Sequence, residues 1–392
     1  MRIVHLIEGL ASGGAERLLY TNLKYFDRSL FQSEVITVFS SSMHWKEPIE
    51  ALGVKVTGLD CRNLRDLPQG VRRLRRLLHN SRPDLIHTHL WAANVIGRVA
   101  GRLDGIPVIG SIHSPDHEPD AWDDGAEVSL LKRWLAWSMD RWTARFGCER
   151  LVAVSEYVRR SAHERLGFPL ERIDLLYNPI DIDQFQSGAT RGRQELIEEL
   201  GLPEGSFILL NVARVAPHKG LLHAIRALPA VREKYPKTYL VSVGPTDDQR
   251  WLSRLEAEAY SLGVSRHVRF LGVRRDIPDL LRCCDLFIFP SLYEGLGISL
   301  IEAMASGCAC VALRAGPFTE VIRQGVDGWL IPPADVRALA DAVCLLLKDE
   351  GRRERLGEAA AKSVRAQFHP ETAARKLEDV YEAVLSSARS GA

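Results

Sequence analysis

The sequence predicts an α/β protein with two doubly wound, Rossmann-like domains facing a central cleft. The chain has 392 residues, of which 46% are hydrophobic, and this exceeds what one ordinary core accommodates. Short apolar runs alternate with amphipathic helical patterns, which is typical of parallel sheets with crossover helices. The alternation stops at a polar stretch, Asp183–Arg193, and then begins again. This stretch is therefore the predicted linker.

The first half contains a series of short apolar runs that we expect to be buried strands. They are Ile3–Ile7, Val35–Phe39, Leu85–Thr88, Val108–Ser111 and Leu151–Val154. A glycine-rich turn follows the first run, and a helix is expected from about Ala15. Apolar residues at helical spacing predict another helix over Val71–His79.

A second series of predicted strands follows the linker. Its members are Phe207–Val212, Tyr239–Val243, Val268–Phe270, Leu286–Phe289 and Ala309–Leu313. We therefore expect an N-terminal domain over residues 1–184 and a C-terminal domain over residues 185–368. Residues 369–392 are expected to end the chain as a helix, with an amphipathic pattern over Pro370–Ser386.

Composition excludes several classes of protein. Lys and Arg total 51 against 50 for Asp and Glu, so no global basic field exists to hold nucleic acid. The seven cysteines show no C-x-x-C pair or zinc spacing and are expected to be reduced thiols. No apolar run approaches the roughly 20 residues that span a bilayer, and His5 and Glu8 interrupt the apolar start. We expect a cytoplasmic protein, and any membrane contact is expected to be peripheral, at the inner face.

The loop after the first predicted strand holds the first candidate site. Gly13 and Gly14 stand ahead of a helix, where their N–H groups could approach an anion. A tight turn between strand and helix is the alternative. The loop has neither G-x-G-x-x-G nor G-K-[ST], which argues against a Rossmann dehydrogenase and a P-loop protein.

Two cations follow the first strand of the second half. Arg214 and Lys219 lie five residues apart across a Pro-containing loop and could converge on one diphosphate. They would then neutralise a leaving pyrophosphate without a metal. Solvated loop cations are the alternative. Asp181-Ile182-Asp183 is similar to a metal-binding D-x-D, but it lies at the domain junction, so we predict no metal and no cofactor.

The segment Pro290–Gly307 carries the strongest pattern. A strand runs into a glycine-rich loop and then a helix, with Glu294 in the loop and Glu302 in the helix. Loop N–H groups at the helix N-terminus would face a ligand. A loop carboxylate could accept hydrogen bonds from sugar hydroxyls, and the helix carboxylate could bind a ribose. A helix cap plus a surface glutamate is the alternative, which the glycines and Pro290 disfavour.

This segment resembles the E-x7-E signature of the family 4 retaining glycosyltransferases, which have the GT-B fold. Further motifs resemble landmarks of that family in the family's order. They are Gly13–Glu16, Asp84–His89, Ser111–Ser114, Val152–Glu156, Asn178–Asp181, Arg214 with Lys219-Gly220, and Glu320–Ile322 with Gly325 and Gly328. The resemblance covers nearly the whole chain.

The resemblance implies transfer of a sugar, with retention, from a nucleotide diphosphate sugar, expected to carry UDP, to a glycan or lipid-linked glycan acceptor. Bacterial surface polysaccharide or glycolipid synthesis is the expected setting. The residues with implied catalytic roles are His113, at the cleft wall, and Glu294, Arg214 and Lys219. The implied donor contacts are Gly13 and Gly14 to phosphate, Arg214 and Lys219 to the diphosphate, Glu294, Gly295, Leu296, Gly297 and Ile298 to the sugar, Glu302 to the ribose, and Val273 and Arg274 near the base.

The chain departs mildly from the family pattern. Ala213 replaces a frequent Gly, Leu296 a frequent Phe, and Pro317–Thr319 a more glycine-rich turn, which leaves the donor preference open. The family's last helix crosses back to the N-terminal domain, and we expect the same here. An epimerase or phosphorylase of the same fold and a non-catalytic nucleotide-sugar binding protein are the rival functions. The binding protein should lack one of the charged residues that this chain retains.

Two basic helices in the first half bear on the acceptor. Arg72, Arg73, Arg75 and Arg76 are expected to form a solvated basic face, with anionic lipid or a lipid diphosphate as the alternative. The segment Leu130–Phe146 carries several tryptophans and cations, and its apolar residues form one helical stripe. We expect that stripe to face the core. Tryptophans beside basic residues also fit a membrane surface, which is the alternative.

Overall fold

The computed structural model describes residues 1–11, 13–40, 43–115, 129–186 and 191–390. These residues divide into two compact units. Those up to Ile180 and from Phe368 onward form unit 1, and those from Asp181 to Gln367 form unit 2. Residues 187–190 of the predicted linker lie outside the described residues.

Unit 1 is built on a seven-stranded parallel sheet with the order β3-β2-β1-β4-β5-β6-β7. Its strands are β1 (Arg2–Ile7), β2 (Gln32–Phe39), β3 (Lys55–Cys61), β4 (Leu85–His89), β5 (Val108–Ile112), β6 (Arg150–Ala153) and β7 (Ile173–Leu175). The helices are α1 (Gly14–Tyr25), α2 (Lys46–Ala51), η1 (Leu64–Asp66), α3 (Leu67–Ser81), α4 (Trp91–Asp104), α5 (Leu130–Gly147), α6 (Glu156–Ser161), η3 (Ala162–Leu166), η4 (Leu170–Arg172) and α16 (Pro370–Ser390).

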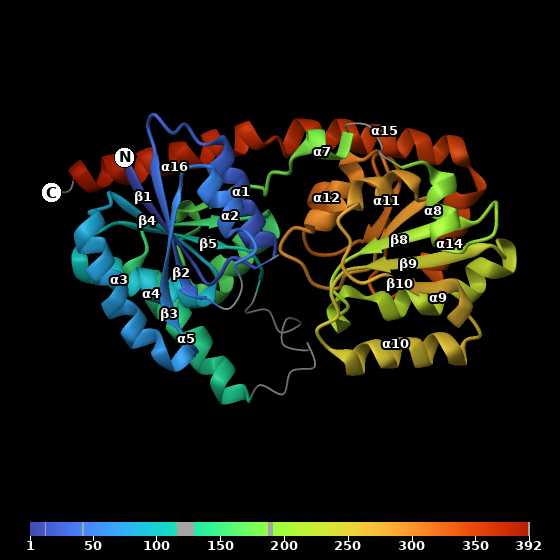
Figure 1. Cartoon of the computed structure of the whole chain (residues 1–392), viewed down its shortest axis with the longest axis horizontal. Helices are drawn as coiled ribbons and strands as arrows, with labels where there is room; N and C mark the ends of the chain where they lie inside the picture. The colour runs from blue at the N-terminus through green and yellow to red at the C-terminus, as the bar shows by residue number, and fades with distance from the viewer. Residues whose placement is uncertain (12, 41–42, 116–128, 187–190, 391–392) are drawn as a thin grey trace. The chain divides into compact units, whose positions relative to one another are not determined.

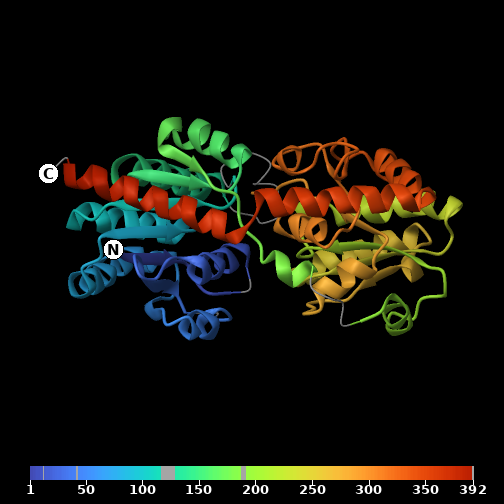
Figure 2. The ribbon, with the colours of Figure 1, turned by 90° about the horizontal axis from the view of Figure 1, so that it is seen from above.

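Figure 1 draws the strands of this sheet as arrows among the helices of unit 1. Alternating side chains of β1 pack on opposite faces of the sheet. Ile3 and Ile7 join a core cluster with residues of α1 and α16, whereas Val4 and Leu6 join a cluster with residues of α3 and α4. This alternation follows from the two-residue period of a strand. The long helix α16 therefore completes the core of unit 1, and Figure 2 shows it lying along the sheet.

Unit 2 is built on a six-stranded parallel sheet with the order β10-β9-β8-β11-β12-β13. Its strands are β8 (Phe207–Val212), β9 (Thr238–Val243), β10 (Val268–Phe270), β11 (Leu286–Phe289), β12 (Cys310–Leu313) and β13 (Trp329–Ile331). The helices are α7 (Ile182–Gln186), α8 (Arg193–Glu199), η5 (Pro217–Lys219), α9 (Leu221–Lys234), α10 (Gln249–Ser261), η6 (Ser265–His267), α11 (Ile277–Cys283), α12 (Ile298–Ala305), α13 (Phe318–Val321), α14 (Val336–Lys348) and α15 (Glu350–Gln367).

The two parallel sheets with flanking helices confirm the predicted pair of doubly wound domains. The strand order reverses beside the first strand of each unit, between β1 and β4 in unit 1 and between β8 and β11 in unit 2. Ligands of open α/β sheets bind at such switch points, outside the carboxyl ends of the strands. The loops at these two points are therefore the expected ligand-binding regions.

The sequence prediction missed three strands, β3, β7 and β13, and each lies at the edge of its sheet. β7 and β13 have three residues each, and β3 is mostly polar or small outside Val56 and Leu59. Central parallel strands are buried on both faces and give continuous apolar runs, whereas edge strands do not. The hydrophobic pattern therefore predicted the central strands of each sheet and missed three of the edge strands.

The segment Leu130–Phe146 forms the predicted helix, α5, but the prediction that its apolar stripe faces the core was wrong. Leu131 and Trp142 are 65% and 67% exposed. The helix instead packs on α4 through small and polar residues such as Ala144 and Asp140, which are buried. Among the described residues, no helix is long and apolar enough to cross a membrane.

Candidate functional site

In unit 2, the loops after β8 and β11 bring two predicted site residues together. Lys219 ends the short helix η5 after β8, and Glu294 lies in the loop between β11 and α12. The Lys219 Nζ atom is 2.6 Å from Glu294 Oε1, and the two side chains are only 17% and 16% exposed. Ser291 Oγ donates a hydrogen bond to the same carboxylate oxygen at 2.9 Å. The pair therefore has a fixed, partly shielded position at the switch point.

Backbone contacts fasten these two loops to each other. The Leu292 N–H donates to the carbonyl oxygen of His218 at 2.7 Å. Gly220 has φ +68°, and a Cβ atom on it would lie 1.8 Å from the carbonyl oxygen of Pro290. Only glycine tolerates both that conformation and that approach. The Lys-Gly pair in the sequence is thus a requirement for placing Lys219 beside Glu294.

The same loop leads into the N-terminus of α12. Gly297 is the residue before the helix, with φ +87°, and Leu296 beside it is buried. The first N–H groups of a helix have no acceptor within it, so the amides of Ile298 and Ser299 stand at an anion-attracting end. Glu302 lies about one turn further along and is 5% exposed. Gly295 is also buried.

Arg214, the second predicted cation, does not join the Lys219–Glu294 pair. Its side chain is 60% exposed, and its Nε lies 3.7 Å from Oδ2 of the exposed Asp247. An ion pair of that length between exposed groups contributes little to stability. The guanidinium is therefore held only loosely at the carboxyl end of β8.

The loop after β10 contains the predicted base contacts, Val273 and Arg274. Val273 is 73% exposed, whereas Arg274 is held by carboxylates. The Arg274 guanidinium donates to Glu199 at 2.5 Å and to Asp276 at 2.5 and 2.8 Å. The hydrogen bonds that Arg274 donates to Asp276, and then those to Glu199, raise the pKa of Arg274 above its ordinary value. The ion pairs of Arg274 thus hold this loop in place. Val273 is the exposed apolar side chain of the loop.

In unit 1, Gly13 and Gly14 lie after β1, as predicted, and Gly13 is the residue that precedes α1. A Cβ atom on Gly13 would lie 2.4 Å from Oε2 of Glu16 in the first turn of α1. The carboxylate of Glu16 therefore already lies at this helix end. An anionic ligand at Gly13 and Gly14 would meet that charge, which distinguishes this end from the N-terminus of α12.

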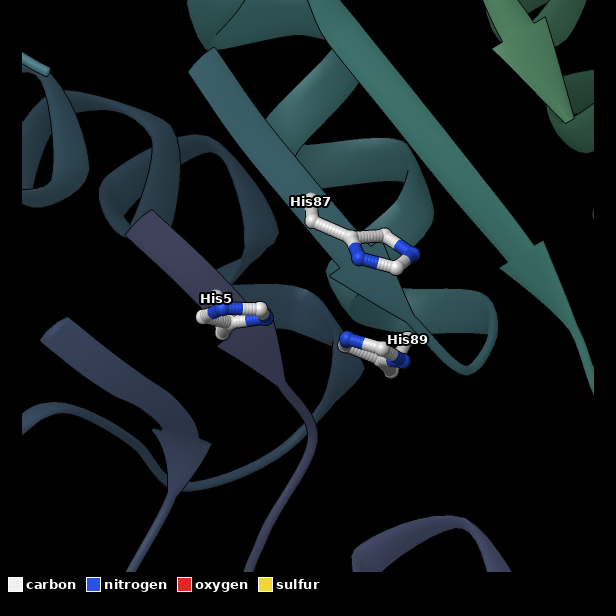
Figure 3. A group of neighbouring side chains, drawn as sticks. All are labelled: His5, His87 and His89. Atoms are coloured by element: carbon white, nitrogen blue, oxygen red, sulfur yellow. The ribbon is translucent and has the colours of Figure 1, made fainter. Parts of the chain in front are cut away.

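His113 follows β5 and belongs to a group of imidazoles that sequence reasoning did not assemble. Its Nε2 atom lies 3.3 Å from Nδ1 of His89, and a cavity of about 30 Å³ adjoins it. Figure 3 shows His89 with His87, on β4, and His5, on the neighbouring strand β1. The missed signal was the alternating His-x-His of β4, with His5 directly opposite His87 in the strand register.

The histidines of this group differ in the number of hydrogen bonds that their rings make. His87 Nδ1 lies 2.7 Å from Tyr381 Oη of α16, and its Nε2 lies 2.8 Å from Ser111 Oγ. Among the described residues, neither ring nitrogen of His5 has a hydrogen-bond partner, nor does Nε2 of His89. A buried polar atom without a partner costs free energy.

Burial lowers the pKa of each of these imidazoles. The pKa of His5 falls to about 3 and that of His113 to about 4. Burial, and then the neighbouring imidazoles, holds the pKa values of His87 and His89 well below their ordinary value. All four rings are therefore neutral near pH 7.

Neutral imidazoles are also metal ligands. One nitrogen from each of His5, His87 and His89 lies within 4.8 Å of the others. His87 already uses both of its nitrogens in hydrogen bonds, so a metal would have to displace Tyr381 or Ser111. The hydrogen bonds of His87 therefore argue against a three-histidine metal site.

Two protein-family models match this chain. A family model described as "Glycosyltransferase Family 4" matches residues 12–184, and one described as "Glycosyl transferases group 1" matches residues 192–363. The fold and the two matches define a GT-B-type glycosyltransferase. The chain belongs to the family 4 glycosyltransferases, and it is an enzyme.

Two relatives illustrate the similarity in sequence. The Escherichia coli UDP-Gal:alpha-D-GlcNAc-diphosphoundecaprenol alpha-1,3-galactosyltransferase is 26% identical over 74% of this chain and 73% of its own length. The Mycobacterium tuberculosis glycogen synthase is 29% identical over 79% of this chain and 70% of its own length. The first relative is named for a diphosphoundecaprenol-linked substrate and the second for glycogen, so membership of the family leaves the acceptor open.

Solved structures share the fold. Anabaena HepE in complex with UDP-glucose covers 98% of this chain and 100% of its own, with a TM-score of 0.85 and 23% identity. WaaG, a glycosyltransferase involved in lipopolysaccharide biosynthesis, covers 95% of this chain and 98% of its own, with a TM-score of 0.72 and 19% identity. At these identities the likeness concerns the fold.

Proposed function

We propose that this glycosyltransferase moves a sugar, with retention, from a UDP-sugar to a hydroxyl of a glycan or lipid-linked glycan acceptor. The observation that carries the proposal is the contact of Lys219 with Glu294 at the β8–β11 switch point, beside the N-terminus of α12. A cation, a carboxylate and a helix end at one place suit a diphosphate joined to a sugar. The E. coli relative, named for UDP-Gal and a diphosphoundecaprenol acceptor, supports the choice of donor and acceptor.

In this proposal unit 2 binds the donor. Lys219 and Arg214 hold the diphosphate, and the amides of Gly295 to Ile298 with Glu294 hold the sugar. Glu302 binds the ribose, and the loop with Val273 and Arg274 contacts the base. When a donor binds, Lys219 turns from the Glu294 carboxylate to phosphate, which leaves Glu294 to accept hydrogen bonds from sugar hydroxyls. The ion pair thus keeps Lys219 and Glu294 close to the proposed positions of the diphosphate and the sugar.

Breaking the bond between the sugar and the diphosphate has the highest free-energy barrier. Lys219, Arg214 and the α12 amides stabilise the departing charge, an effect that usually supplies the largest share of catalysis. A departing phosphate oxygen takes the proton from the acceptor hydroxyl, so no enzymic base is required. His113 of unit 1, whose lowered pKa keeps it neutral, contributes a hydrogen bond near the reacting sugar and no charge. Gly13 and Gly14 contact donor phosphate once the Glu16 carboxylate, which lies at this helix end, turns away from it.

We further propose that residues 1–184 bind the acceptor and residues 185–368 bind the donor, with residues 369–392 returning to the first domain. Synthesis of a bacterial surface polysaccharide or glycolipid is the proposed setting, with the protein at the inner face of a membrane. The placement of α16 in the core of unit 1 supports the return of the last helix.

A thermal-shift screen of UDP, GDP and ADP sugars tests the proposed donor. A ligand at 100 times its Kd stabilises the folded protein by about 2.7 kcal/mol, so the correct donor gives a clear rise in Tm. We expect UDP sugars to raise the Tm and ADP sugars to leave it unchanged. Turnover followed by product NMR then reports the anomeric configuration. Release of a free epimer or sugar phosphate without acceptor would instead indicate an epimerase or phosphorylase.

A further inference from the structure

The outer face of α5 is an exposed apolar surface. Six large side chains of this helix are between 40% and 67% exposed: Leu131, Trp134, Leu135, Met139, Trp142 and Phe146. They recur at helical spacing and form one stripe, which we call the α5 stripe. Single exposed apolar residues are ordinary, but a contiguous exposed patch marks an interaction site.

Contacts on the inner face fix the orientation of α5. The indole of Trp91 donates to the Ala136 carbonyl oxygen at 3.2 Å, and the indole of Trp137 donates to the Arg165 carbonyl oxygen at 3.0 Å. Asp140 pairs at 2.5 Å with Arg98, whose side chain is fully buried. Rotating the helix to bury the stripe would leave the Arg98 charge buried without its carboxylate, at a cost of several kcal/mol. The contacts of the inner face therefore keep the stripe exposed.

The exposed charged side chains of α5 beside the stripe are positive. Lys132 and Arg145 are exposed and lie at opposite margins of the stripe. The helix contains one acidic residue, Asp140, which is buried and paired. The surface thus combines aromatic and aliphatic side chains with cations and presents no carboxylate of its own helix.

We propose that the α5 stripe binds the surface of a membrane that contains anionic lipid. Tryptophan and leucine side chains enter the boundary between headgroups and acyl chains, and Lys132 and Arg145 contact lipid phosphates. At 1.5 Å per residue the helix is about 27 Å long and lies in the membrane plane. A symmetric contact between two copies of α5 would bring equal positive charges together, so lipid is the better occupant.

The same helix links this surface to the candidate site in unit 1. Asp140 and Trp91 line the cavity beside His113, so the inner face of α5 borders that cavity while the outer face meets lipid. A lipid-linked acceptor would then reach the cavity from the membrane surface. This link rests on the proposed function, whereas lipid binding by the stripe does not require it.

Co-sedimentation with vesicles tests the inference. The probes are vesicles of equal parts phosphatidylglycerol and phosphatidylcholine, and vesicles of phosphatidylcholine alone. We expect the full chain to bind the anionic vesicles and to bind the neutral vesicles far more weakly. Replacing one stripe residue, as in Trp142→Ser or Leu131→Gln, should lower the partition coefficient roughly tenfold. Charge reversal at Lys132 or Arg145 should lower it by at least about fivefold on anionic vesicles.

Tyr260→Ser is the matched control, because Tyr260 is a 79% exposed aromatic residue on α10 of unit 2. This variant should bind vesicles as the parent chain does, and all variants should keep the parent's Tm. Failure of the parent to bind anionic vesicles, or equal binding by Trp142→Ser, would overturn the inference. So would a dimer without vesicle binding that Trp142→Ser converts to a monomer. None of these results bears on donor binding, which is measured separately.

Discussion

At the scale of single residues, the Lys219–Glu294 pair joins a local contact to the proposed chemistry. We expect Lys219→Ala and Glu294→Gln each to lower kcat/KM by about 100-fold or more, the usual loss when one preorganised transition-state contact is removed. Each substitution should also lower stability, because it leaves a mostly buried partner group without its counter-charge or hydrogen bond. Turnover with the donor found by the screen measures the first effect and thermal unfolding the second.

The controls for this prediction are Lys237→Ala and Glu256→Gln, which change exposed residues of unit 2. Both should leave turnover at the parental level. If Lys219→Ala and Glu294→Gln also transfer sugar at near-parental rates, these residues are not the donor site.

The buried imidazoles predict a pH dependence of folding. Burial lowers the pKa of His5 to about 3. Between about pH 6.5 and pH 3, His5 is therefore protonated in the unfolded chain but neutral in the folded chain. Stability is thus fully present above about pH 6.5 and falls as the pH drops toward 3, by about 1.4 kcal/mol per pH unit for each such histidine. We expect His5→Leu to flatten this slope, as measured by urea unfolding between pH 6.5 and 4.5.

His79→Leu is the matched control, because His79 is exposed on α3. It should leave the slope of the parent chain unchanged. An unchanged slope in His5→Leu would mean that His5 is protonated in the folded protein or is not buried as described.

At this scale, the sequence pointed to candidate residues but not to their contacts. Glu294, Lys219 and the loop glycines stood out because they follow predicted strands, where ligands of open α/β sheets bind. That Lys219 contacts Glu294 while Arg274 pairs with Glu199 and Asp276 depends on side chains up to 75 residues apart. No local pattern specifies such pairings. The histidine cluster was missed because His-x-His in β4 does not by itself show that His5 lies opposite His87.

At the scale of elements, the approach of the η5 loop to the β11 loop depends on one glycine. In Gly220→Ala the new methyl would meet the Pro290 carbonyl oxygen at 1.8 Å, so the loops must separate. We expect a loss of stability of more than about 2 kcal/mol, since the left-handed conformation alone costs about 1–2 kcal/mol. Donor affinity should fall with it. Chemical unfolding and titration with the donor measure the two effects.

Gly263 offers a close control, because its φ is +69° and a Cβ atom there would meet nothing within 4 Å. Gly263→Ala should show only the conformational cost and keep donor affinity. Equal effects of the two substitutions would show that the contact with Pro290 does not hold the site together.

Helices and strands differ in how far the sequence predicted them. Central strands such as β8 and β11 were placed to the residue, because burial on both faces gives an uninterrupted apolar run. The helix α5 was found, but its orientation was predicted wrongly. An amphipathic pattern identifies an apolar face without saying what covers it, and here Arg98 and Asp140 fix the other face inward.

At the scale of the whole molecule, the sequence predicted two doubly wound domains because the alternation of strands and helices runs twice along the chain. The expected return of the last helix came from the family resemblance, since an amphipathic pattern does not name its partner. In the structure Leu377 and Tyr381 of α16 lie in the core of unit 1, far along the chain from β1. Unit 1 is therefore completed only when the end of the chain is present.

The central claim is that the β8–β11 switch point of unit 2 binds the diphosphate of the donor. Hydrogen exchange of the full chain, with and without a saturating nucleoside diphosphate, tests it most directly. We predict that UDP slows exchange in residues 213–221 and 291–300, the loops that carry Lys219 and Glu294. Exchange in α10, on the same unit, should not change. Unaltered exchange in both loops when UDP is bound would contradict the assignment.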